Sequence, residues 1–374
     1  MGDAMPDRPP IRVIVVDDSA LMRALIKGAL EQDGDIHVVA TAADTVQARE
    51  RIRSLDPDVI TLDVEMPGMN GIEFLQKIMT LRPTPVVMVS TLTARGTDTA
   101  LEALAIGAVD AVAKPEGPEA LAAWGPMLRR IVRGAAGARV QRVGPARQHR
   151  APSPIASPVA SPVAPRAPSP ALPARPAAGR RLVAIGASTG GVGAIGELFA
   201  GLGPGLPPIV ITQHMPPGYT ERFARRLAGQ TGLDVAEGRD GESLARGMVR
   251  IAPGDRHMEV ARQGAGLVLR VGGTEPVSGH CPSVDRLFFS VARACGDQAL
   301  GIILTGMGRD GAEGMLAMAR AGATCLGQSP ESCVVYGMPK AARALGAVTE
   351  ELDLDALARR IRAHGQCRAG AGAS

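Results

Sequence analysis

One stretch of the chain cannot build a packed core, and it therefore divides the sequence in two. Residues 134–179 are rich in proline, alanine and serine. Each proline fixes its own φ angle and removes a backbone donor, so this composition predicts an extended, semi-rigid spacer with polyproline character. We expect the 374 residues to form two domains, with residues 1–10 disordered and residues 132–180 as the linker.

The segments on both sides of this linker alternate short apolar runs with amphipathic stretches. IRVIVVDD at residues 11–18 precedes an amphipathic stretch at 19–32, and LVAIGAS at 182–188 begins the same rhythm again. A buried strand followed by a covering helix is the repeating unit of a parallel, doubly wound sheet. The sequence therefore predicts an α/β fold with two such domains. Only 2% of the residues are aromatic, so the cores should be aliphatic.

Charge, cysteine content and hydropathy disfavour several classes of protein. The 41 basic residues nearly balance the 37 acidic ones, and the aromatic residues that stack on single-stranded nucleic acid are almost missing. Five cysteines form neither a CxxC pair nor a zinc spacing, which predicts free thiols in a reducing cytosol. We find no apolar signal core and no apolar run of about 20 residues, so we expect a cytoplasmic protein without membrane insertion.

Carboxylates follow two of the predicted strands in the first zone. Asp17 and Asp18 end the run IRVIVVDD, and Asp63 ends PDVITLD. The carboxyl ends of parallel strands meet at one edge of a sheet, so these three groups should repel one another unless a hard cation such as Mg²⁺ lies among them. Two further groups belong to the same constellation: Ser90 ends PVVMVS, and Lys114 lies in DAVAKP.

In this combination, residues 11–131 resemble the receiver domain of two-component response regulators, which has a flavodoxin-like fold. The resemblance implies that Asp63 accepts a phosphoryl group from a histidine kinase. It implies that Mg²⁺ is held by Asp17, Asp18, Asp63 and the carbonyl of Glu65. It also implies that Ser90 and Lys114 contact the phosphoryl oxygens, since phosphoryl transfer depends on positioning and charge neutralisation.

One position departs from the receiver pattern. Receivers usually carry Tyr or Phe three residues before the lysine, as an aromatic switch, but this chain has Ala111 there. The departure leaves the phosphorylation of Asp63 intact. It does, however, remove the usual aromatic readout of that phosphorylation.

A glycine-rich turn at residues 186–196, GASTGGVGAIG, has two interpretations. Its second half fits the dinucleotide fingerprint GxGxxG, and its first half fits the nucleophile elbow GxSxG centred on Ser188. A dinucleotide fold needs an acid near the end of the next strand, but PIVITQH ends in Gln213 and His214. A histidine at that strand end can take the proton of a serine, so the sequence favours the nucleophile.

A third strand end completes the arrangement. LGIILTGMGRDG at residues 300–311 supplies Asp310, which could orient the histidine and stabilise its imidazolium form. The chain order Ser, His, Asp differs from the order of the α/β-hydrolases, so a different fold presents the same groups. His257 and His280 are lesser candidates that could line the crevice or bind substrate.

Several further motifs occur in order after the linker: QHMPPGYTERFARRL, IAPGDRHM, PSVDRLFFSVA and SCVVYGMPKAA. With these, residues 181–367 resemble the catalytic domain of the CheB family, the protein-glutamate methylesterases of bacterial chemotaxis. The resemblance implies a Rossmann-like domain without a cofactor. It also implies hydrolysis of glutamate methyl esters and deamidation of glutamines on methyl-accepting chemoreceptors, which gives chemotaxis adaptation.

The resemblance also implies a mechanism. Ser188 attacks the ester after His214 takes its proton, Asp310 supports the histidine, and the Met307 amide with Thr189 nearby stabilises the oxyanion. The unphosphorylated receiver is expected to cover the crevice until a kinase of the chemotaxis type phosphorylates it.

Two other classes of function are weighed against this one. A signalling adaptor would use the second domain only to bind a partner, and the intact serine, histidine and aspartate argue against it. A nucleotide-dependent oxidoreductase would need the acid that is missing after the second strand.

Overall fold

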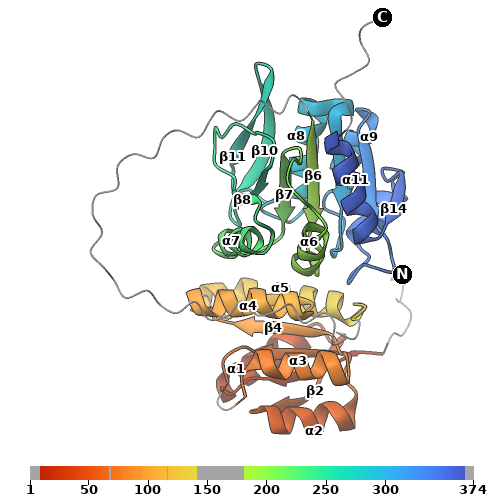
Figure 1. The fold of residues 1–374 in the computed structure, drawn as a ribbon. Helices are drawn as coiled ribbons and strands as arrows, with labels where there is room; N and C mark the ends of the chain where they lie inside the picture. The colour runs from red at the N-terminus through yellow and green to blue at the C-terminus, as the bar shows by residue number, and fades with distance from the viewer. Residues whose placement is uncertain (1–8, 67–68, 92, 116, 141–180, 367–374) are drawn as a thin grey trace, which may run out of the picture.

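The computed structural model describes residues 9–66, 69–91, 93–115, 117–140 and 181–366 (Figure 1). The greater part of the predicted disordered start and of the predicted linker lies outside these residues. Among the residues that are described, no helix is long and apolar enough to cross a membrane.

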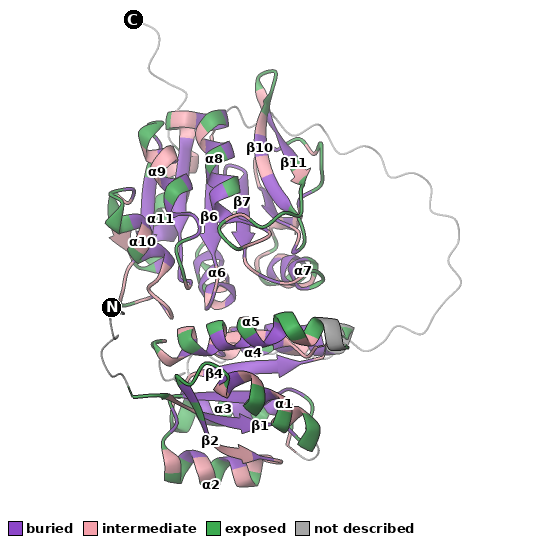
Figure 2. Cartoon of the chain, turned by 180° about the vertical axis from the view of Figure 1, so that it is seen from behind, coloured by how far each residue is buried: buried purple, intermediate pink, exposed green. Residues whose placement is uncertain are grey.

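The N-terminal domain is a parallel sheet of five strands in the order β2-β1-β3-β4-β5. The strands are β1 (Ile11–Val16), β2 (Ile36–Ala42), β3 (Val59–Asp63), β4 (Val86–Ser90) and β5 (Asp110–Ala113). The helices are α1 (Ala20–Glu31), α2 (Thr45–Leu55), α3 (Gly71–Leu81), α4 (Ala94–Ile106) and α5 (Pro118–Ala136). Val13 and Val15 of β1 enter one hydrophobic cluster and Ile14 and Val16 enter another, which is why residues 13–16 are all apolar. Figure 2 shows this burial along the central strands.

Helix starts determine which residues remain in the loops at the carboxyl edge of this sheet. The side chains of Ser19 and Asn70 each accept a backbone hydrogen bond in the first turn of the helix that follows, which fixes the starts of α1 and α3. A Cβ atom at Gly71 would lie 2.2 Å from the carbonyl oxygen of Asp63. Glycine therefore allows α3 to begin close against the end of β3.

The C-terminal domain contains a parallel sheet of seven strands in the order β14-β13-β12-β6-β7-β9-β8. The strands are β6 (Leu182–Ala187), β7 (Ile209–Gln213), β8 (Asp234–Glu237), β9 (Met248–Ile251), β12 (Ala299–Ile303), β13 (Thr324–Gln328) and β14 (Glu350–Leu352). The helices are α6 (Gly191–Ala200), α7 (Tyr219–Thr231), α8 (Val284–Cys295), α9 (Ala312–Arg320), α10 (Met338–Ala344) and α11 (Leu354–Gln366). The prediction of two parallel α/β domains is confirmed.

Strand order places the centre of this sheet where ligands bind in open α/β folds. The chain proceeds from β6 to one side through β7 and returns to the other side through β12, so the order reverses beside β6. An antiparallel hairpin of β10 (His257–Gln263) and β11 (Gly266–Gly272), which the sequence analysis did not predict, packs against α8. The residues after β6, β7 and β12 thus share one edge.

The two domains meet through helices and strand ends. Figure 1 shows α4 and α5 of the N-terminal domain facing α6 and α7 of the C-terminal domain. The Asp98 carboxylate of α4 and Arg222 of α7 form an ion pair at 2.6 Å. A Cβ atom at Gly134 of α5 would lie 2.5 Å from the sulfur of Met307, so the Met307 side chain packs directly on the backbone of α5. One hydrophobic cluster includes residues of both domains.

Candidate functional site

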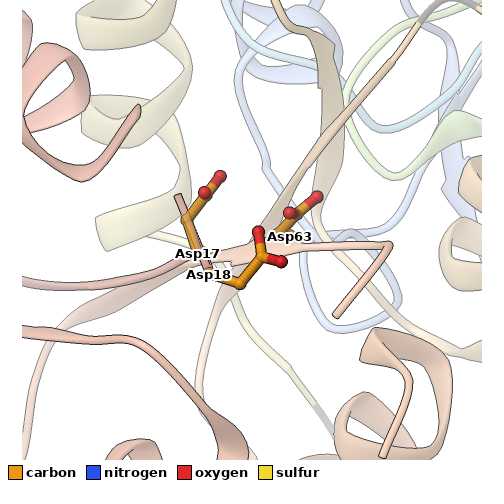
Figure 3. Close-up of side chains that lie close together, drawn as sticks. All are labelled: Asp17, Asp18 and Asp63. Atoms are coloured by element: carbon orange, nitrogen blue, oxygen red, sulfur yellow. The ribbon is translucent and has the colours of Figure 1, made fainter. Parts of the chain in front are cut away.

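Three carboxylates gather at the edge of the N-terminal sheet. Asp17 and Asp18 follow β1, and Asp63 ends the neighbouring strand β3 (Figure 3). One oxygen of each carboxylate lies within 4.8 Å of the others. Asp17 and Asp63 are buried and Asp18 is exposed. Oxygen donors at this spacing suit a hard divalent cation such as Mg²⁺, so the donor set fits the predicted ion.

A lysine lies beside the two buried carboxylates. The Nζ atom of Lys114 is 2.8 Å from an oxygen of Asp63 and 2.9 Å from an oxygen of Asp17. Burial raises the pKa of Asp63 above its usual range; Lys114 opposes this shift, and the charge of Asp17 adds to it. The Glu65 N–H donates to an oxygen of Asp63 at 3.4 Å. The negative charge of this cluster is therefore only partly balanced by the protein itself.

Ser90, the serine predicted to contact the phosphoryl group, also contacts the C-terminal domain. Ser90 is 1% exposed, and its carbonyl accepts the Lys114 N–H at 2.7 Å. Its hydroxyl lies 3.3 Å from the hydroxyl of Tyr219, the first residue of α7. Sequence reasoning missed Tyr219, because the contact depends on how two domains dock.

A histidine and a carboxylate pair at the edge of the C-terminal sheet. The Nε2 atom of His214, directly after β7, lies 2.8 Å from an oxygen of Asp310. The Nδ1 atom of His214 is buried and has no hydrogen-bond partner among the described residues. That second nitrogen is therefore available to accept a proton.

The start of α8 holds the Asp310 carboxylate. The carboxylate accepts hydrogen bonds from the Ser283 hydroxyl at 2.9 Å and from the N–H groups of Val284 at 2.7 Å and Asp285 at 3.0 Å. Burial by itself would raise the pKa of Asp310, but the bond with His214 and the two N–H donors lower it below its usual range. A carboxylate at a helix N-terminus is also stabilised by the helix dipole. Asp310 is thus held in its charged form.

Ser188 lies on the sharp turn between β6 and α6. Its N–H donates to the Thr305 carbonyl at 3.1 Å, and its carbonyl accepts from the Gln213 amide at 2.9 Å. Ser188 and His214 line the same small cavity. A Cβ atom at Gly306, beside Met307, would lie 2.8 Å from the Ser188 Cβ, so the loop after β12 packs directly on the serine. The structure brings Ser188, His214 and this loop together.

Gly191 of the same turn has a packing role. A Cβ atom at Gly191 would lie 2.1 Å from Oε1 of Gln213. The glycine is therefore needed so that Gln213 can brace the turn. Packing within the domain therefore accounts for Gly191, the first glycine of the GxGxxG spacing.

The two further histidines have different surroundings. The His280 ring stacks on the His214 ring, with centroids 3.8 Å apart and planes 5° from parallel. Burial and the charge of His214 lower the pKa of His280 to about 3. His257 accepts the Ser283 N–H at 3.1 Å through Nδ1, and its Nε2 lies 2.8 Å from the Glu275 carbonyl oxygen. His280 thus belongs to the site, whereas His257 braces the residue that supports Asp310.

Residues of the N-terminal domain cover the serine. Leu104 and Asp110 line the cavity of Ser188. The Thr189 hydroxyl donates to an oxygen of Asp110 at 2.8 Å, and burial raises the pKa of Asp110. The Gly190 N–H donates to the Val109 carbonyl at 3.1 Å. No local sequence signal could have identified Asp110, since its environment is made by the docked domain.

Comparison with known proteins gives matches over both domains. Residues 183–361 match the family model described as CheB methylesterase, and residues 13–124 match that of the response regulator receiver domain. The protein-glutamate methylesterase/protein-glutamine glutaminase of Salmonella typhimurium is 46% identical over 355 residues, which cover 94% of this chain and 96% of the relative. The protein-glutamate methylesterase/protein-glutamine glutaminase 1 of Caulobacter vibrioides is 49% identical over 360 residues, which cover 94% of this chain and 97% of the relative. The solved catalytic domain of Thermotoga maritima CheB methylesterase covers 48% of this chain and 96% of its own, at 33% identity and a TM-score of 0.47.

Proposed function

This chain belongs to the CheB family of receiver-regulated protein-glutamate methylesterases and glutaminases, and we propose that Ser188, His214 and Asp310 carry out its ester hydrolysis. The observation that supports this assignment is the 2.8 Å contact between His214 and Asp310, beside a cavity that His214 shares with Ser188. Nucleophile, base and supporting acid thus lie at one sheet edge.

The free nitrogen of the histidine determines how the reaction starts. The Nδ1 atom of His214 takes the hydroxyl proton of Ser188 as the serine oxygen attacks the ester carbonyl. Asp310, fixed in its charged form, stabilises the imidazolium that results. The backbone N–H of Met307 and the nearby Thr189 support the oxyanion.

The same groups complete the cycle. His214 returns the proton to the leaving group, so methanol departs from a methyl ester and ammonia from a glutamine side chain. The acyl-enzyme is then common to both substrates, and water resolves it with His214 again as base. The substrates are glutamate methyl esters and glutamines of methyl-accepting chemoreceptors.

The receiver supplies the control. A chemotaxis-type histidine kinase donates the phosphoryl group to Asp63, and Ser90 and Lys114 contact its oxygens. Bound Mg²⁺ would neutralise charge during the transfer. Its ligands would be Asp17, Asp18, Asp63 and the Glu65 carbonyl.

The docked receiver blocks the hydrolase site. Support comes from Leu104 and Asp110, which close the cavity of Ser188, and from the hydrogen bond between Thr189 and Asp110. Phosphorylation at Asp63 needs only to make the docked arrangement less favourable than the open one.

We assign residues 11–131 to the receiver and 181–367 to the methylesterase domain, with 132–180 as linker and 1–10 as a disordered start. Helix α5 itself continues to Ala136. Limited proteolysis that cuts first between 132 and 180 is the expected result, and cuts first within either sheet would contradict the assignment.

The test of the function is methanol release from methylated receptor membranes, measured with and without a small phosphodonor and Mg²⁺. We expect release that requires Ser188 and rises with phosphodonor only when Asp63 is present. Ser188→Ala and Asp63→Ala are the matched variants. Absence of release from every methylated receptor, with a phosphorylated receiver, would instead favour the adaptor.

A further inference from the structure

A buried pair of hydroxyl groups crosses the boundary between the two domains. Ser90 at the end of β4 is 1% exposed and Tyr219 at the start of α7 is 2% exposed. Their hydroxyl oxygens lie 3.3 Å apart. Buried hydroxyl groups need a hydrogen-bond partner, and each of these two finds one in the opposite domain.

The receiver has no phenolic hydroxyl of its own to contact Ser90. The two tyrosines of the chain, Tyr219 and Tyr336, both follow the linker. Within the receiver sheet Ser90 is paired with Ala113, and Ala111 lies on the same face of β5 two residues earlier. Ala111 contributes only a methyl group there, and it packs against the hydrophobic cluster that contains Tyr219. The aromatic side chain therefore comes from the other domain.

The start of α7 contacts α4. The Tyr219 N–H donates to the Pro216 carbonyl at 3.3 Å. One turn later, Arg222 forms its 2.6 Å ion pair with Asp98. Burial raises the pKa of the Tyr219 phenol, while hydrogen bonds with Ser90 and Thr97 oppose the shift. The Thr97 hydroxyl gives its own proton to the Thr93 carbonyl, so it can accept from the phenol. The phenol thus stays protonated, and its oxygen can accept the proton of Ser90.

The contact between Ser90 and Tyr219 should respond to phosphorylation, because Ser90 has a single hydroxyl proton to donate. A serine hydroxyl carries one proton and can give it to one acceptor at a time. Lys114, whose N–H bonds the Ser90 carbonyl, has its ammonium 2.8 Å from Asp63. A hydroxyl that turns to donate to a phosphoryl oxygen on Asp63 is no longer oriented toward Tyr219.

We propose that Tyr219 is a positioning residue that couples phosphorylation of Asp63 to domain docking through its hydrogen bond with Ser90. The proposal rests on the proposed function, in which Ser90 contacts the phosphoryl group. Without phosphate, the bond stabilises the docked arrangement that covers Ser188. With phosphate, Ser90 turns away from Tyr219, and the docked state loses this buried hydrogen bond. In the open state water can bond both hydroxyl groups, so the open state is not destabilised in the same way. Linkage is reciprocal, so docking in turn disfavours phosphorylation.

The test is Tyr219→Phe in the full chain, which removes one hydroxyl and keeps the ring. We expect methanol release without phosphodonor to rise about fivefold, the effect of one lost buried hydrogen bond. Because Ser90 is free to contact the phosphoryl group only in the open state, the open fraction sets both rates, and the rate at which acetyl phosphate with Mg²⁺ phosphorylates Asp63 should rise by a similar factor. Fluorescence of Trp124, whose indole N–H donates to the Ala113 carbonyl at 2.8 Å, reports that rate, with Asp63→Ala as its blank.

Tyr336→Phe is the matched control, since the Tyr336 hydroxyl bonds Glu351 within its own domain. It should change neither rate. Ser90→Ala removes the Ser90 bond from the other side and leaves the bond with Thr97. Adding Tyr219→Phe to Ser90→Ala should therefore raise basal release by a smaller factor than Tyr219→Phe does in the wild type.

Unchanged basal release in Tyr219→Phe would overturn the proposal. A rise in basal release with an unchanged phosphorylation rate would also overturn it, because the tyrosine would then be a packing contact only. By contrast, wild-type release that ignores phosphodonor, or that survives Ser188→Ala, would contradict the proposed function itself.

Discussion

Both domains place charged residues at the carboxyl ends of parallel strands, but they stabilise those charges differently. In the methylesterase domain, Asp310 accepts hydrogen bonds from Ser283 and two N–H groups of α8, and its pKa is lowered despite burial. In the receiver, burial raises the pKa of Asp63 and of Asp110, although Lys114 and Thr189 lie beside them.

The difference follows what each carboxylate has to do. In the proposed function Asp310 keeps one charge state through every catalytic cycle, so a preorganised set of donors suits it. In the same proposal Asp63 changes its charge on phosphorylation, and Asp110 contacts Thr189 of the other domain only while the domains are docked. A charge that the protein stabilises incompletely can be released or altered at small cost. The receiver carboxylates are thus suited to a change in charge or environment, whereas Asp310 is suited to remaining ionised.

The largest expected effect is on kcat when Asp310 loses its charge. Asp310→Asn should lower kcat for methanol release by about 10⁴-fold, because the histidine loses the acid that orients it and stabilises its cation. Asp285→Asn is the matched control: this neighbouring buried carboxylate accepts from the Gly314 N–H at 2.7 Å and from Ser278 at 3.0 Å. Equal losses in the two variants would mean that Asp310 acts only through folding.

The next effect concerns the ring that stacks on His214. A neutral aromatic face against the imidazolium stabilises it and holds its plane, so His280→Ala should lower kcat about tenfold with KM unchanged. His280→Phe keeps the face and should recover most of the rate with the same acid limb in its pH profile. If Phe is as inactive as Ala, the imidazole nitrogens of His280 matter and stacking is not its role.

A smaller effect of opposite sign is expected at the interface. In the docked structure burial raises the pKa of Asp110, so we expect its charged form to weaken docking, and docking to strengthen as pH falls through that raised pKa. Asp110→Asn, which still accepts from Thr189, should therefore lower basal methanol release a few-fold at neutral pH. Phosphodonor should restore the rate. A rise in basal release would show that the carboxylate charge favours docking.

The smallest effect is on stability. Folding raises the pKa of Asp63 above its ordinary value of 3.8, so its ionised form disfavours the folded state, increasingly as pH rises from 3.8 through the raised pKa. Asp63→Asn should give a small increase in Tm at neutral pH without Mg²⁺, and none at pH well below 3.8. Mg²⁺ should raise the Tm of the wild type more than that of the variant. Thermal unfolding across pH measures both.

Much of the site could be predicted because its residues end apolar strands. Asp63, Ser188 and His214 each come directly at or after a buried run, and parallel strands bring their ends to one edge. The β10–β11 hairpin was missed, since its alternation is short and lies between helices of a parallel fold. The stacking of His280 was not predictable from spacing either, because the residue lies on a loop.

The sequence by itself determined the two-domain α/β fold and the family, through the period of its apolar runs and the residues that end them. Such local patterns act within a few turns of chain and need no partner domain. Only the tertiary structure decided that Tyr219 bonds Ser90 and that Asp110 lies over Ser188. Ser90 and Tyr219 lie 129 positions apart in the chain. Asp110 and Thr189, which hydrogen-bond beside Ser188, lie 79 positions apart. Their energies depend on burial that exists only when the domains dock, and no stretch of sequence encodes that burial locally.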